Sequence, residues 1–421
     1  MAYSDNQYLD EKASPVEVEV LPVPATYAAP SKKPSFFRGL LRFITILLGT
    51  LLVVDVFRHG ADYARSISGC HGMMKGDDGH HQHPIPPIDH WKPFNGTTHF
   101  ELEPNAATGI SVNGAQAFGK VVFETSKLSD KVVIDLDIKT NKKDKHGEVS
   151  IEEKDGYLTV KTPSTGKLET HVSARIQIPS NILGTFGLPK FDLNLPKHMV
   201  DYSALPESLE IGILAIRLAK GFVKPGPVHT NVTQLTVAKG ALHGSLTQGR
   251  YETSVDVASG NVTLDISDIS GGNEGKSNIK LGNGHLKGSF PVYNSTTLDV
   301  AKGSIYANVQ FEHACESNRA ELSTKIGSGP ARIYVDSIAA ERLLKSYHTS
   351  VSGDQLITYP ENFQGTIDAR GIAGDIKLEG KDLAVEKVLG GLQGKKGDSN
   401  RNYVSVKAAK GALDIQVGDD E

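Results

Sequence analysis

A short unit that repeats about every twenty residues constrains the fold of this chain more than any other feature of the sequence. Each copy has alternating apolar residues, a corner of small residues ending in glycine, and a second alternating stretch. Such a period is typical of supersecondary units that stack and share one core. The clearest corner glycines are Gly240, Gly260, Gly284 and Gly303, which are 20, 24 and 19 residues apart (260−240, 284−260, 303−284). Looser copies of the unit surround Gly329, Gly374 and Gly411.

The repeats predict an all-β domain of β-solenoid or β-roll type over residues 207–421. Glycine at each corner permits the positive φ or the close backbone approach that a sharp bend needs. Polar residues such as Thr236, Asp256, Lys280 and Asp299 then face solvent along one wall. The alternative is a meander or sandwich whose hairpins are evenly spaced.

Residues 95–206 also read as strands, and we expect a small β-sandwich-like region there. In Val132–Ile138 and Val172–Ile178 apolar residues alternate with polar ones, and Pro179 ends the second stretch. The 43 glycines and 7% aromatic residues suit many tight turns and favour β architecture over a helical bundle. Two segments interrupt the strand pattern: Asp336–Tyr347, expected to be a short helix or an irregular cap, and Gly390–Asn400, expected to be a loop.

An apolar run near the start, Gly39–Phe57, predicts a membrane span. Its nineteen residues reach roughly 28 Å as a helix, close to the hydrocarbon thickness of a bilayer. We expect a single transmembrane signal anchor at residues 37–58, after a disordered cytosolic tail at residues 1–36. A cleaved signal peptide and a buried helix are the alternatives, because the uninterrupted middle of the run is only a dozen residues long.

The flanking charges predict which side of the membrane holds the bulk of the chain. Four cations precede or enter the span and two follow it, and cations tend to stay in the cytosol. Acceptor sequons for N-glycosylation occur only after the span. They predict glycosylation at Asn95, Asn231, Asn261 and Asn294. The chain is therefore expected to be a type II protein of the secretory pathway, at the plasma membrane, with its C-terminal domain extracellular or lumenal.

Residues 59–94 form an expected His/Gly/Pro-rich stalk that holds the domain off the bilayer. Its weak candidate metal ligands are His80, His81 and His83, but no predicted rigid element carries them, so no metal site is expected. The two cysteines, Cys70 and Cys315, can pair with each other or remain apart.

Recognisable catalytic motifs are missing from the sequence. No nucleophile elbow, zinc-binding helix motif or dinucleotide fingerprint occurs, and no cofactor is expected. The net charge of −4 argues against a nucleic-acid partner. Paired acids such as Asp368 and Asp375 could serve a polysaccharide-active enzyme, but acids on exposed strand faces are ordinary solubility residues.

A strand that ends in Ile176-Gln-Ile-Pro179, followed by units of the form apolar-x-apolar-x-x-Gly-x-apolar, resembles adhesin-like β-repeat families known as domains of unknown function. The resemblance covers roughly Val132 to Val417 and is closest to fungal membrane-anchored members. It implies a β-solenoid or β-roll without established catalytic residues.

Three functional hypotheses follow. The first is a non-enzymatic surface protein that contacts cell-wall polysaccharide, other glycans or surface proteins. The second is a polysaccharide-active β-solenoid enzyme, which requires acids from neighbouring repeats in one groove. The third is a secretory-pathway scaffold whose cytosolic tail carries sorting information.

Overall fold

The computed structural model describes residues 90–104, 107–141, 149–163, 168–182, 187–267, 275–311, 319–338 and 342–418. All of them lie in one compact unit, His83–Glu421. The expected span Gly39–Phe57, the candidate ligands His80, His81 and His83, and both cysteines lie outside these residues. Across the described residues, no helix has the length and apolar character needed to cross a membrane.

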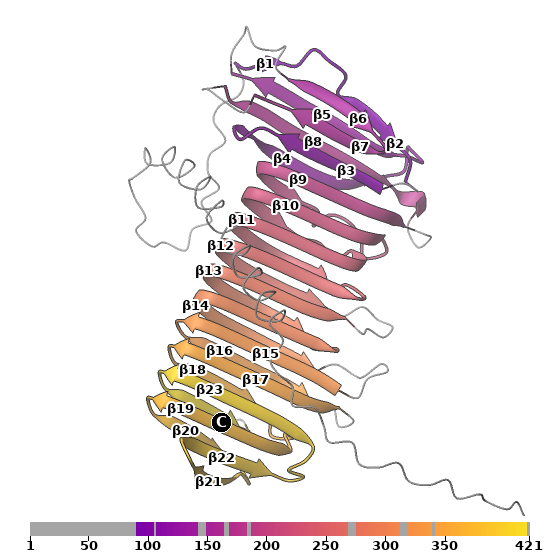
Figure 1. Ribbon diagram of the computed structural model, residues 1–421. Coiled ribbons are helices and arrows are strands. Elements are labelled where there is room, and N and C mark those ends of the chain that lie inside the picture. Colours follow the sequence, from indigo (N-terminus) through magenta and orange to yellow (C-terminus); the bar gives the residue numbers. More distant parts are fainter. Residues whose placement is uncertain are drawn as a thin grey trace, which may run out of the picture. The chain divides into compact units, whose positions relative to one another are not determined.

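The centre of the sheet consists of long strands that each pair in parallel with the next along the chain (Figure 1). They are β9 (Leu188–Asp201), β10 (Glu210–Lys224), β11 (His229–Thr247), β12 (Glu252–Ser267), β13 (Lys276–Pro291) and β14 (Ser295–Phe311). Successive strands of a hairpin meander run antiparallel, so the parallel pairing excludes a meander for this part. We call these strands and the parallel pairs that extend them the coil stack, and one turn of it a coil.

Each long strand from β10 to β14 bends at its corner glycine, so that both of its arms bury apolar side chains. In β12, Val255 and Val257 are buried before the corner, whereas Val262 and Leu264 are buried after it. Buried positions thus change from odd to even numbers across the bend at Gly260. Both arms therefore face a shared interior, and one hydrophobic cluster runs from Leu102 to Val417.

The corner glycines lie on top of one another from coil to coil. Gly240 is in register with Gly260, and Gly260 with Gly284. At Gly260 φ is +147°, in a region that is essentially restricted to glycine. A Cβ added to Gly260 would lie 1.5 Å from the carbonyl oxygen of Gly240. The glycines are therefore required both by backbone conformation and by the close approach of neighbouring coils.

Beyond β14, each coil is divided into two short strands on either side of its corner. The divided coils are β15 (Arg319–Ser328) with β16 (Ala331–Ile338), β17 (Leu343–Ser352) with β18 (Gln355–Tyr359), β19 (Gly365–Ala373) with β20 (Ile376–Gly380), and β23 (Asn402–Lys410) with β24 (Leu413–Val417). Two antiparallel strands, β21 (Ala384–Val388) and β22 (Gly391–Lys396), follow β20 and pair with each other.

The last coil in the sequence is not the last coil in space. β23 pairs in parallel with β17 on one side and with β19 on the other, and β24 pairs likewise with β18 and β20. The coil β23/β24 is thus inserted between two coils that precede it in the chain. β22 covers the outer edge of β19 with antiparallel pairing.

The N-terminal end repeats this arrangement in reverse. The coil formed by β3 and β4 lies between β9 and the coil formed by β7 and β8. The first coil in the sequence is thus inserted between two coils that follow it in the chain. β5 pairs antiparallel with β8, and β1 and β2 pair antiparallel with β5. The bounds are β1 (Lys92–Pro93), β2 (His99–Leu102), β3 (Ala107–Asn113), β4 (Ala117–Ser126), β5 (Val132–Thr140), β6 (Ser150–Lys154), β7 (Tyr157–Lys161), β8 (Thr170–Pro179) and the 3-10 turn η2 (Ser180–Ile182).

Antiparallel strands therefore cover both ends of the coil stack. An open edge strand is a template for pairing with another chain. The outermost strands at the two ends include β6 and β21, which are mostly exposed and carry charged residues such as Glu152, Glu153, Glu386 and Lys387. This charge disfavours end-to-end association of stacks.

Three expectations from the sequence differ from the structure. The strands before residue 207 join the same sheet as the repeats through β3, β4 and β9, instead of packing as a sandwich. The expected loop Gly390–Asn400 contains strand β22 (Gly391–Lys396). In Asp336–Tyr347, where a short helix or an irregular cap is expected, the residues that the structure describes at the two ends belong to strands β16 and β17 instead of a helix.

Tertiary contacts explain why the second half of this segment, in β17, is a strand and not a helix. β17 pairs with β15 on one side and β23 on the other, which outweighs local helical spacing. Arg342, just before β17, is only 2% exposed. Its guanidinium donates hydrogen bonds to the carbonyl oxygens of Val292, at 2.8 Å, and Tyr293. Arg342 thereby ties the start of this coil to the loop before β14.

The inserted coil gives a first testable prediction. Truncation after Asn400 removes β23 and β24, whose buried Val404, Val406, Leu413 and Ile415 each contribute about 1.5–3 kcal/mol. It also removes Asn402, whose side chain accepts from Leu344 N at 2.8 Å and donates to Gln364 O at 2.6 Å. We expect the midpoint of thermal unfolding, followed by circular dichroism, to fall by about 20 °C or more.

A truncation after Gly418 is the matched control and is expected to leave the midpoint within about 2 °C. A peptide covering residues 400–418, added to the protein truncated after Asn400, should restore part of the lost thermal stability. An unchanged midpoint after removal of β23 and β24 would contradict the inserted position of this coil.

Candidate functional site

The two outer surfaces of the coil stack are the candidate site. Outward residues before each corner glycine form wall 1, and outward residues after it form wall 2. Because the coils are in register, equivalent side chains of successive coils form columns. Within a column, neighbouring residues are about 4.8 Å apart, the spacing of neighbouring strands. A side chain's place in a column follows from its distance to the corner glycine.

On wall 1, the fourth residue before the corner forms a column of alternating charge. Asp256 is in register with Lys280, Lys280 with Asp299, and Asp299 with Lys325. Opposite charges on neighbouring strands stabilise a sheet by roughly 0.2–1 kcal/mol per pair. This column is neutral overall, and it confirms the solvent-facing positions expected for Asp256, Lys280 and Asp299, with Asp299 half-buried and the other two exposed.

On wall 2, the third residue after the corner gives a different column. Lys287 is in register with Tyr306, and Tyr306 with Arg332. The ammonium of Lys287 lies 5.7 Å from the centroid of the Tyr306 ring. In the column two residues further on, Asn308 is in register with Tyr334. The rings of Tyr306 and Tyr334 are 5.7 Å apart between centroids.

We call Lys287, Tyr306, Asn308, Arg332 and Tyr334 the tyrosine–cation patch. Tyr306 is 40% exposed, and both cations are exposed. No carboxylate of the described residues forms an ion pair with either cation. Sequence reasoning missed this patch, although alignment of the repeats on Gly284, Gly303 and Gly329 places Lys287, Tyr306 and Arg332 at one position.

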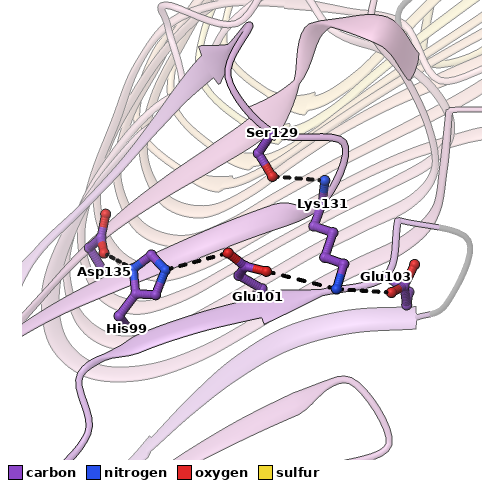
Figure 2. A network of polar contacts seen from close by, with 6 residues as sticks. All are labelled: His99, Glu101, Glu103, Ser129, Lys131 and Asp135. Carbon is purple, nitrogen blue, oxygen red and sulfur yellow. Dashed lines mark hydrogen bonds and ion pairs between the residues drawn. The ribbon is translucent and has the colours of Figure 1, made fainter.

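A second polar network lies at the N-terminal end (Figure 2). His99 Nδ1 of β2 lies 2.7 Å from Asp135 Oδ1 of β5. Lys131 lies between Glu101, at 3.8 Å, and Glu103, at 3.5 Å. The hydrogen bond to Asp135 raises the pKa of His99. The network joins β2 and β5, two of the antiparallel strands that cover the N-terminal end of the coil stack. Exposed ion pairs of this kind contribute little to stability.

The acids considered for polysaccharide chemistry do not share a wall. Asp368 lies in β19 and accepts hydrogen bonds from Arg370 Nε at 2.9 and 3.0 Å. Asp375 follows the corner glycine Gly374 and is exposed on the other side of the bend. The described residues also contain no group of three or more His, Cys, Asp or Glu side chains arranged to hold a metal ion.

The expected glycosylation sites lie at accessible places of the unit. Asn95, Asn231 and Asn261 are exposed, and Asn294 is half-buried. Asn231 and Asn294 both precede their corner glycines by nine residues (240−231, 303−294). Asn261 lies on wall 2, where its Oδ1 accepts from His285 N at 3.3 Å.

Comparison with known proteins gives no family assignment. No protein-family model matches the chain, and no curated protein sequence matches it. Among solved structures, a candidate adhesin from Parabacteroides merdae is 12% identical, with 77% of this chain and 98% of that chain covered and a TM-score of 0.35. A candidate cell adhesion protein from Clostridium sporogenes is 13% identical, with 77% and 100% covered and a TM-score of 0.18. A candidate lipid-binding protein from Parabacteroides distasonis is 14% identical, with 77% and 98% covered and a TM-score of 0.27. These TM-scores are too low to transfer a function.

Proposed function

We propose that this chain is a non-enzymatic, single-pass type II membrane protein that displays its coil stack for adhesive contact with cell-wall polysaccharide or surface proteins. The observation that carries the proposal is the pair of outer walls, where side chains repeat in register over many coils. A regular, exposed wall offers an extended partner many equivalent contacts.

Sequence features supply the membrane part of the proposal. The apolar run Gly39–Phe57, the cation bias before it and the downstream sequons support an extracellular position of the stack at the plasma membrane. The stalk spaces the stack from the bilayer, and glycans at the four sequons would lie on the displayed unit. The motif ending at Pro179 and the repeats support membership of an adhesin-like family of fungal membrane-anchored proteins.

Binding to wall polysaccharide tests this function. The full-length chain, purified in lipid nanodiscs, is incubated with insoluble fungal cell walls, and empty nanodiscs are the control. We expect saturable retention of the protein and no release of reducing sugar ends. Failure to bind walls or intact cells would contradict adhesion, and release of reducing ends would favour the enzyme hypothesis.

A further inference from the structure

The two walls differ in what separates their cations. On wall 1, Lys280 and Lys325 are separated by Asp299, so their charges are largely compensated. On wall 2, the same two coils, on either side of β14, carry Lys287 and Arg332, separated by Tyr306. Wall 2 thus has two cations about 10 Å apart along the stack, with an aromatic ring between them in place of a carboxylate.

We propose that the tyrosine–cation patch binds an acidic polysaccharide whose chain runs along the stack, across the coils β13, β14 and β16. This inference rests on the proposed function and names the class of glycan. Lys287 and Arg332 pair with carboxylates of the polymer, because cations attract anionic groups most strongly where no protein acid competes. Arg332 offers a planar fork of donors that suits a carboxylate.

The two tyrosine rings favour binding of a sugar over binding of a simple anion. Tyr306 and Tyr334 lie close together on the wall, with their planes tilted by 52°. Such rings present apolar faces and hydroxyl groups at once, which suits a pyranose with C–H and O–H groups. Asn308 adds an amide donor and acceptor in the column of Tyr334.

The coil spacing favours an extended partner over a compact one. Neighbouring coils are about 4.8 Å apart, close to the length that one pyranose residue adds to an extended glycan. Successive sugars therefore reach successive coils without bending. An exposed wall, unlike a closed pocket, leaves both ends of a long polymer free to continue.

Oligogalacturonate is a suitable probe because every residue has a pyranose ring and a carboxylate. Its dissociation constant is measured with the full-length chain in nanodiscs, beside neutral dextran of equal length and polyglutamate of equal charge. We expect Lys287→Ala with Arg332→Ala to weaken oligogalacturonate binding by about tenfold. Tyr306→Ala with Tyr334→Ala should weaken it similarly, whereas Tyr306→Phe should retain most of it.

Lys280→Ala with Lys325→Ala is the matched control, because it removes the same charge from coils β13 and β15 on wall 1. It is expected to leave the dissociation constant within about twofold. Unfolding midpoints of all variants show whether each remains folded.

Three results would overturn the inference. They are equal losses in the wall 1 and wall 2 variants, equal affinity for polyglutamate, and no binding of oligogalacturonate. If wall retention persists in any of these cases, the proposed adhesive function stands and only the acidic-glycan site is lost. If wall retention is also absent, both fail.

Discussion

Replacing Gly260 by alanine is expected to destabilise the coil stack by about 4 kcal/mol or more, because two costs combine. The backbone φ of +147° is unfavourable for any residue with a Cβ. The new Cβ would also meet the carbonyl oxygen of Gly240 at 1.5 Å. The contacted atom belongs to the backbone, and Gly260 is held in register with Gly240 on one side and Gly284 on the other. Movement of a side chain therefore cannot relieve the contact. Chemical unfolding followed by circular dichroism measures the loss.

Ser259→Ala is the matched control, since Ser259 is the preceding corner residue and is half-buried. We expect its free energy of unfolding to change by no more than about 0.5 kcal/mol. A free energy of unfolding of Gly260→Ala within about 1 kcal/mol of that of the unsubstituted protein would contradict the close contact between coils at this corner.

Acid is expected to weaken the fold through two buried histidines. His348 is fully buried, with Nδ1 2.8 Å from Thr324 Oγ1 and Nε2 2.8 Å from Tyr359 OH. Burial lowers its pKa to about 3. His198 donates from Nε2 to the carbonyl oxygen of Val172 at 3.0 Å, and burial lowers its pKa to about 4.

The direction of the effect follows from proton binding. Below about pH 6.5 the unfolded chain binds a proton at each histidine, while the folded protein keeps both rings neutral down to about pH 4. The free energy of unfolding therefore falls as pH falls, by about 2 kcal/mol per histidine between pH 6.5 and pH 5. Urea unfolding at pH 7.5, 6 and 5 measures this loss.

His348→Gln keeps hydrogen-bonding groups but cannot titrate, so its stability should depend less on pH between 6.5 and 5. His90→Gln is the control, because His90 is exposed, and it should retain the full dependence. A pH dependence that is the same in His348→Gln and in the unsubstituted protein would contradict the contribution of His348.

The local bends of this fold could be predicted from the sequence, because a corner that requires positive φ leaves glycine at a regular spacing. Gly240, Gly260, Gly284 and Gly303 all have positive φ, as do the looser copies Gly329, Gly374 and Gly411. The parallel pairing follows once equivalent corners are placed on one another. Here local chemistry and tertiary structure agree.

The order of the coils could not be predicted, because strand patterns do not specify partners that are distant in sequence. β17 and β23 are in register across 58 residues, Lys345 with Tyr403, yet both have ordinary alternation. The helix expectation failed for the same reason, since the pairing of β17 on both sides outweighs local preference.

The tyrosine–cation patch lies between these cases. Lys287, Tyr306 and Arg332 occupy equivalent positions of recognisable repeats, so alignment on the corner glycines brings them together. Their exposure and the absence of a carboxylate partner in the described residues required the structure. The buried ring of His348 was not foreseen, because its interior column holds aliphatic residues such as Leu298 and Val406, with the polar Thr324 next to it.

The accessibility of the two ends of the full-length protein on intact cells tests surface display directly. One epitope tag is placed before Met1 and another after Glu421, and live cells are treated with protease or labelled with antibody. We expect the C-terminal tag to be labelled and removable on intact cells, and the N-terminal tag to become accessible only after permeabilisation. A C-terminal tag that is protected until the cells are permeabilised would contradict surface display.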